Sequence, residues 1–114
     1  MNNSNNSMTV TARLFLRKAE WKKDGKDKAG LVIKFKANGV NYSSFRDHGI
    51  TTEAWKVIKP EFGDVKTSSK DGTNYRDTGI EFDVTFRSLD DNGKVYIESA
   101  VKAAPAESPE DMGL

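Results

Sequence analysis

Three segments of the chain alternate between apolar and polar residues with a period of two: residues 9–17, 31–37 and 80–87. The apolar positions are Val10, Ala12, Leu14 and Leu16 in the first segment, Leu31, Ile33, Phe35 and Ala37 in the second, and Ile80, Phe82, Val84 and Phe86 in the third. A period of two predicts β-strands that bury one face.

Turn-forming residues place two more strands beside these. Asn38-Gly39 is a strong hairpin signal because both residues accept positive φ, so residues 40–46 are expected to pair back as a third strand. Asp91-Asn92-Gly93 makes a similar turn before a last strand over residues 94–101. Residues 20–29, rich in lysine around Asp24-Gly25, predict an exposed basic turn or hairpin loop.

A short helix is predicted over residues 51–59. Thr51 or Thr52 can cap it, Pro60 ends it, and one side is apolar through Ala54, Trp55, Val57 and Ile58. Residues 61–78 are rich in turn formers and predict a long mobile loop, with room for a brief strand around Val65.

These elements predict a mainly β domain over residues 9–102, between a disordered segment over residues 1–8 and a flexible acidic tail over residues 103–114. Five short strands bury little as a flat sheet, and closing them into a small barrel removes exposed edges. A helix between the third and fourth strands completes the element order of the five-stranded OB barrel. An open antiparallel sheet with the helix on one face is the alternative.

The net charge of +1 conceals a gradient along the 114 residues. Residues 13–36 hold nine basic and three acidic residues, whereas residues 77–114 hold three basic and nine acidic residues. Such asymmetry is typical of a surface for polyanions joined to an acidic tail. A basic hairpin that simply faces solvent would give the same first block.

The composition argues against several classes of protein. Without cysteine the chain has no disulfide, thiolate metal site or cysteine nucleophile, and His48 is its single histidine. No phosphate-binding loop or convergent set of titratable groups is evident, so we expect no enzyme, cofactor or metal site. No apolar run is long enough to span a membrane, and the first seven residues lack a secretory pattern, so a cytoplasmic protein is expected.

Basic residues interleaved with aromatic ones favour a surface for single-stranded nucleic acid, because cations meet phosphates while flat rings stack on unpaired bases. The candidate residues are Arg13, Phe15, Arg17, Trp21, Lys22, Lys23, Lys34, Lys36, Tyr42, Arg46 and Tyr75. Tyr42 and Phe45 have opposite parity, so a regular strand cannot present both on one face. Glu81 and Asp83 count against the surface if they share its face, because they would repel phosphate.

In this strand order, and in its C-terminus Glu107-Ser108-Pro109-Glu110-Asp111-Met112-Gly113-Leu114, the chain resembles the single-stranded DNA-binding proteins of phages, plasmids and bacteria. The resemblance spans residues 9–101 and the tail, and the small size is closest to phage or mobile-element versions. It implies that Glu110, Asp111, Met112 and Leu114 bind replication or recombination proteins. Leu114 stands where an aromatic residue is usual in that family, and the run of acids is shorter, which leaves the partner open.

We therefore expect a protein that binds single-stranded DNA with little sequence preference during replication or recombination, in the cytoplasm of a bacterial host if phage-encoded. RNA binding by the same fold stays open, as does a homodimer formed through an unpaired first or last strand. The alternative is a protein-interaction or phage structural β-barrel module that binds no nucleic acid.

Overall fold

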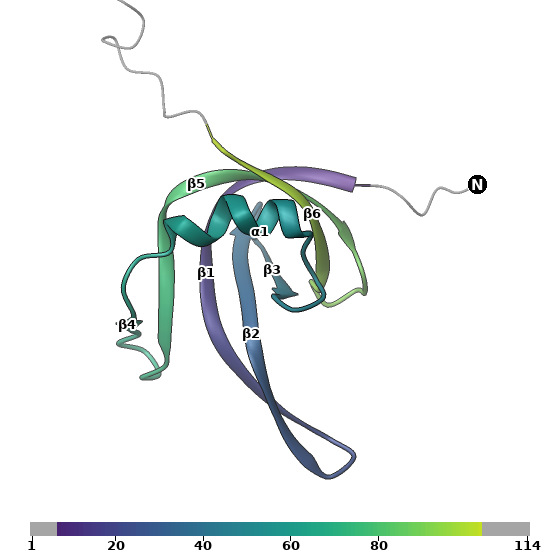
Figure 1. Ribbon diagram of the computed structural model, residues 1–114, viewed down its shortest axis with the longest axis vertical. Helices are drawn as coiled ribbons and strands as arrows, with labels where there is room; N and C mark the ends of the chain where they lie inside the picture. The colour runs from purple at the N-terminus through teal and green to yellow at the C-terminus, as the bar shows by residue number, and fades with distance from the viewer. Residues whose placement is uncertain (1–6, 104–114) are drawn as a thin grey trace, which may run out of the picture.

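The computed structural model describes residues 7–103, and six strands make one antiparallel sheet with a single short α-helix (Figure 1). The elements are β1 Ser7–Lys23, β2 Lys26–Ala37, β3 Val40–Phe45, α1 Thr52–Ile58, the 3-10 turn η1 Lys59–Glu61, β4 Lys66–Thr67, β5 Asn74–Ser88 and β6 Val95–Lys102. The strand order is β3-β2-β1-β5-β4, and β6 pairs with β5. The predicted mainly β class with one short helix is confirmed. No helix within residues 7–103 is long and apolar enough to cross a membrane.

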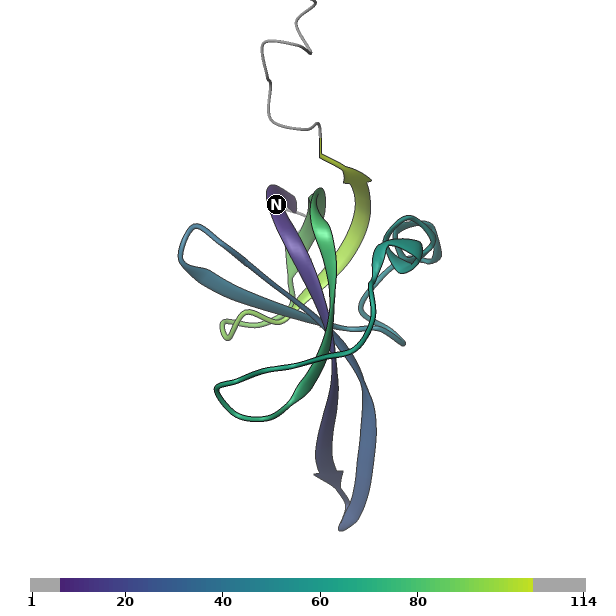
Figure 2. The same ribbon diagram turned by 90° about the vertical axis from the view of Figure 1, so that its left-hand side faces the viewer.

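The hairpin of β1 and β2 is longer than the sequence predicted. Residues 20–29 were expected as a loop, but the strands stay paired until Lys23 lies opposite Lys26. Asp24 (φ 55°) and Gly25 (φ 75°) form the whole turn, the two-residue type that best matches strand twist. We call residues 18–31 the arm, and Figures 1 and 2 show it extending beyond the rest of the sheet. Because neither face of the arm is covered, its sequence lacks the alternation that marks a strand.

The core lies on the face of the sheet toward which α1 packs. Its fully buried large side chains are Leu14, Ile33, Ile58, Phe82, Val84, Phe86, Val95 and Ile97. The predicted helix is confirmed: the Ala54 N–H donates to the Thr51 hydroxyl (3.2 Å), the N-terminal cap that the sequence offered.

The predicted loop over residues 61–78 is partly regular structure, because β5 begins at Asn74 rather than near Ile80. The short strand β4 pairs with its first residues, Lys66 opposite Tyr75, which confirms a brief strand close to Val65. The first β5 residues were missed because a bulge breaks the alternation. Arg13 lies opposite Glu81 and Phe15 opposite Asp77, so three β5 residues face Leu14 alone.

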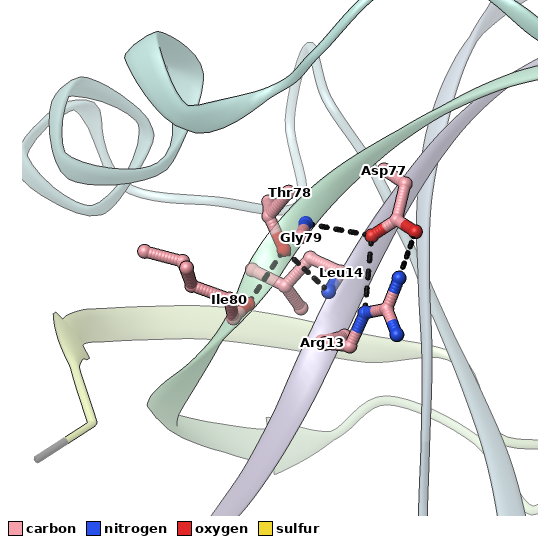
Figure 3. A network of polar contacts seen from close by, with 6 residues as sticks. All are labelled: Arg13, Leu14, Asp77, Thr78, Gly79 and Ile80. Atoms are coloured by element: carbon pink, nitrogen blue, oxygen red, sulfur yellow. Dashed lines mark hydrogen bonds and ion pairs between the residues drawn. The ribbon is translucent and has the colours of Figure 1, made fainter. Parts of the chain in front are cut away.

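Side chains satisfy the backbone groups that this bulge leaves without strand partners (Figure 3). The Leu14 N–H donates to the Thr78 hydroxyl (3.2 Å), which donates to the Ile80 carbonyl (2.8 Å). The Gly79 N–H donates to the Asp77 carboxylate (2.8 Å), and Gly79 has φ 72°. The same carboxylate is ion-paired with Arg13.

The two ends of the sheet approach each other through isolated contacts. Ser43 of β3 forms a parallel bridge with Lys94, its N–H donating to the Gly93 carbonyl (2.8 Å). Ile50 forms a second parallel bridge with Ile97 of β6. The sheet is open apart from these bridges, so full closure of the expected barrel is not seen.

Candidate nucleic-acid interface

The face of β1, β2 and β3 that points away from the core carries most of the predicted binding residues, and we call it the outer face. Arg17 lies opposite Tyr75 of β5 on one side and Val32 of β2 on the other, while Val32 lies opposite Phe45 of β3. Residues opposite one another share a face of a sheet, so these four form a row across four strands. Asp77, Phe15, Lys34 and Ser43 form the next row.

Phe15 and Tyr75 make the first aromatic cluster of the outer face. Their ring centroids are 6.0 Å apart and the planes are inclined by 64°. Both side chains are half-buried, and with Arg17 and Lys34 they line a hollow of about 350 Å³ that the turn from Ser68 to Thr73 borders. We call it the Phe15–Tyr75 hollow. The structure thus brings together four predicted residues from three strands.

Among residues 7–103, Asp71 is the one carboxylate that lines this hollow. The hydroxyl of Thr73 donates to Asp71 (2.7 Å), and so does its N–H (3.1 Å). These hydrogen bonds, first that of the hydroxyl, lower the pKa of Asp71. The carboxylate therefore stays charged near neutral pH, and phosphates in the hollow would favour the side of Arg17 and Lys34.

A second aromatic cluster lies where the arm meets β3. The Trp21 ring is 5.3 Å from that of Phe45, at an angle of 63°. The imidazole of His48 is stacked on Phe45 (5.4 Å, 17°), and the Lys94 ammonium is 5.0 Å from the centre of the Phe45 ring. Lys23 lines a separate hollow beside this second cluster, whereas Lys22 lies 3.8 Å from Asp27 on the same arm. Lys36 is exposed at the other end of the outer face, opposite Asn41.

Three predicted residues are engaged elsewhere. Arg13 is ion-paired with Asp77, so its charge is already balanced within the protein. Arg46 contacts Asp47 (2.9 Å) and lies over the Trp55 ring of α1 (5.8 Å). Tyr42 packs against the core, its ring stacked on Phe35 (5.2 Å) and 4.8 Å from that of Phe86. As expected from their opposite parity, Tyr42 and Phe45 lie on opposite faces of β3, and Phe45 is the one on the outer face.

The electrostatics of Asp77 reflect its ion pair. Burial acts to raise the pKa of Asp77, but hydrogen bonds from Arg13 and the Gly79 N–H, with the charge of Arg13, outweigh burial and lower it. The same hydrogen bond raises the pKa of Arg13. The pair therefore stays ionised, and it links β1 to β5 at the bulge.

Of the acidic residues of β5, Asp77 lies opposite Phe15 but is ion-paired with Arg13, and the other two lie farther along the strand. Glu81 is opposite Arg13, and Asp83 is opposite Thr11, from which it accepts a hydrogen bond (2.6 Å). Both pairs are on the N-terminal side of the bulge, whereas Phe15 and Arg17 are on the other side. The two β5 carboxylates other than Asp77 thus lie beside the other half of β1, beyond the bulge.

The predicted tail residues cannot be placed by the structure. Glu110, Asp111, Met112 and Leu114 lie outside the described residues. Within residues 7–103 no group of three His, Asp or Glu side chains could hold a metal ion. The sequence analysis did not select Phe45, His48 and Lys94 as site residues. The alternation along β3 could have placed Phe45 on the outer face. His48 lies in a turn and Lys94 lies just before β6, so no strand alternation indicates where either side chain points.

Comparison with protein-family models, curated proteins and solved structures finds no match to this chain.

Proposed function

We propose that this protein binds single-stranded DNA with little sequence preference on its outer face. The observation that carries the proposal is the Phe15–Tyr75 hollow, where two partly exposed rings lie beside Arg17 and Lys34. Neither cation has a carboxylate within ion-pair distance among residues 7–103. Rings beside cations that lack partners are the combination that single strands require.

The binding mode follows from the chemistry of these groups. Arg17 and Lys34 neutralise backbone phosphates and release their counterions, which makes binding sensitive to salt. Phe15 and Tyr75 offer ring faces to unpaired bases, and stacking tolerates any base. Lys23, Lys26 and Lys28 of the arm extend the positive surface beyond the hollow, whereas the predicted Lys22 lies on the opposite face of the arm. A duplex hides its base faces and gains only the phosphate contacts.

The strand pairing supports an OB-like barrel as the scaffold. β1 pairs with both β2 and β5, and β6 pairs with β5, while two parallel bridges bring β3 and the following segment toward β6. A barrel of five strands, with β4 as a short addition, uses all of these pairings.

Replacing Tyr75 with alanine tests the hollow directly. The loss of one stacked base lowers the binding free energy for oligo-dT by about 1–3 kcal/mol, measured by fluorescence anisotropy. Tyr96→Ala is the matched control, because Tyr96 lies on β6 against Arg87 (4.8 Å) and away from the hollow. Equal affinities of the Tyr75→Ala variant and the original protein would contradict the proposal, provided thermal melts show both folded. A protein-interaction module predicts no binding of oligo-dT by either.

A further inference from the structure

We propose that the outer face has a second base-binding site, formed by Trp21, Phe45 and His48 together with Lys94. It would hold another nucleotide of the strand that occupies the Phe15–Tyr75 hollow. The inference rests on the proposed function and extends it, because it specifies how many bases the face engages and where the strand continues.

The site is assembled from four separate segments. Trp21 comes from β1 and packs over Gly30 of β2, where a Cβ atom would lie 3.2 Å from the tip of the Trp21 ring. Phe45 ends β3, His48 follows in the next turn, and Lys94 precedes β6. Glycine at position 30 thus lets the large ring lie close to the arm, beside Phe45.

The aromatic side chains of this site lie beside a buried residue of the outer face, Val32. Val32, opposite Phe45 in the strand register, is 6% exposed although it lies outside the main cluster of core side chains. Side chains of the outer face must therefore cover it. Trp21 nevertheless keeps 38% of its surface exposed, so ring area is left for a ligand.

The surroundings of these rings select the class of ligand. Lysines from both strands of the arm and from the segment before β6 border a hollow of about 740 Å³. In the part of the chain that the structure describes, Asp24 is the single carboxylate that lines it. The four lysines are Lys23, Lys26, Lys28 and Lys94. An apolar flat surface surrounded by cations fits a ligand that is both flat and anionic, which describes a nucleotide.

The two aromatic clusters are far enough apart to hold different bases. Tyr75 and Phe45 occupy the same row, three strand spacings apart, which at about 4.8 Å per spacing is about 14 Å. At about 3.4 Å per stacked nucleotide this corresponds to about four steps along a strand. Arg17 lies between them in that row, where it can contact the phosphates of the connecting nucleotides.

The test combines the emission of Trp21 with the affinity of variants for an oligo-dT of about 12 nucleotides. In a Trp55→Phe background Trp21 is the single tryptophan, and its emission should be quenched on binding. Phe45→Leu retains an apolar side chain over Val32 but removes the flat ring, and should weaken binding about tenfold. Lys94→Gln should weaken binding severalfold, while Lys56→Gln on α1 is the matched control and should leave it unchanged.

Combining Phe45→Leu with Tyr75→Ala should multiply the separate losses, to about a hundredfold, because distant sites act independently. The inference is overturned if Phe45→Leu binds like the original protein and Trp21 emission does not change while Tyr75→Ala weakens binding. That result would leave the proposed function intact. Absence of any binding by the original protein would overturn both.

Discussion

The hydroxyl group of Thr78 takes the place of a strand partner at the bulge between β1 and β5. It accepts from the Leu14 N–H and donates to the Ile80 carbonyl, and Thr78 itself is buried. A buried backbone group without a partner costs more than the same group in water. The bulge sets the register at Phe15. Thr78 therefore helps to position Phe15 without lining the hollow itself.

Thr78→Val should lower the free energy of unfolding by about 1–3 kcal/mol, because the shape is retained while the buried N–H of Leu14 and the partly buried carbonyl of Ile80 lose their partner. Urea denaturation gives the value. Thr85→Val is the control: its hydroxyl contacts only that of Thr9 on the surface (2.8 Å), and a change within about 0.5 kcal/mol is expected. Equal stabilities for the two variants would show that the hydroxyl of Thr78 is dispensable.

Asp77 makes stability depend on pH in a defined direction. Its pKa is lowered in the folded protein, so its contribution is present above the unfolded value of about 3.9 and disappears as pH falls through the lower folded value. Asp77→Asn should therefore be less stable at pH 7, by about 1–2 kcal/mol. Urea denaturation between pH 7 and pH 3 should show this gap narrowing only at the acidic end. A gap that is constant over the range would refute the assignment.

The arm is an element that receives little support from the rest of the fold. Beyond Arg17, β1 no longer pairs with β5, and β2 pairs with β3 only from Val32 onward. Two strands alone are marginally stable in water. The arm is thus held by its Asp24-Gly25 turn, by six paired positions between β1 and β2, and by the contact of Trp21 with Phe45.

Amide hydrogen exchange should be faster in the arm, over residues 18–23, than in the paired part of β1 over residues 8–14, because few buried contacts oppose its opening. Oligo-dT should slow exchange in the arm if its lysines and Trp21 contact the strand. NMR detection resolves both segments within one protein, so each serves as the control for the other. Equal protection without DNA would contradict the structural argument, and exchange unaffected by oligo-dT would contradict the binding role of the arm.

Elements that are determined by a few neighbouring residues could be predicted from the sequence. Elements that depend on pairing with a distant strand could not. The Thr51 cap, Pro60 and the Asn38-Gly39 turn each act within a few residues, and the helix and hairpin were predicted accordingly. The start of β5 depends on a bulge opposite Leu14, which no periodicity reveals.

Some residues of the candidate site could likewise be predicted from the sequence, and others could not. Parity along β1 predicted that Phe15 and Arg17 face away from the core, and the structure confirms this orientation. Tyr42 could have faced either way until its neighbours Phe35 and Phe86 were known. His48 and Lys94 meet at Phe45 only because the approach to β6 lies beside β3.

At the scale of the whole molecule, charge separates along the fold. The arm and the outer face carry many of the lysines of residues 13–36, while Glu81 and Asp83 lie beyond the bulge. The near-zero net charge of the chain therefore hides a surface rich in lysine. The proposal predicts that affinity falls with salt in proportion to the number of phosphates neutralised.

Lys34→Gln should reduce the slope of log affinity against log salt by about 0.7, the value for one phosphate contact on a single strand. Affinity at low salt should fall as well, while stability changes little because Lys34 is exposed. Lys56→Gln, which alters a lysine of α1, should leave the slope unchanged. Identical slopes for the two variants would place Lys34 outside the interface.

The central claim is tested most directly by the anisotropy of a labelled oligo-dT of about 30 nucleotides, titrated with the full chain at low and moderate salt against unlabelled duplex. Our account predicts binding that weakens as salt rises and that matched duplex displaces poorly, because only the single strand offers base faces to Phe15 and Tyr75. No binding at low salt, or displacement by duplex as effective as by single strand, would contradict it.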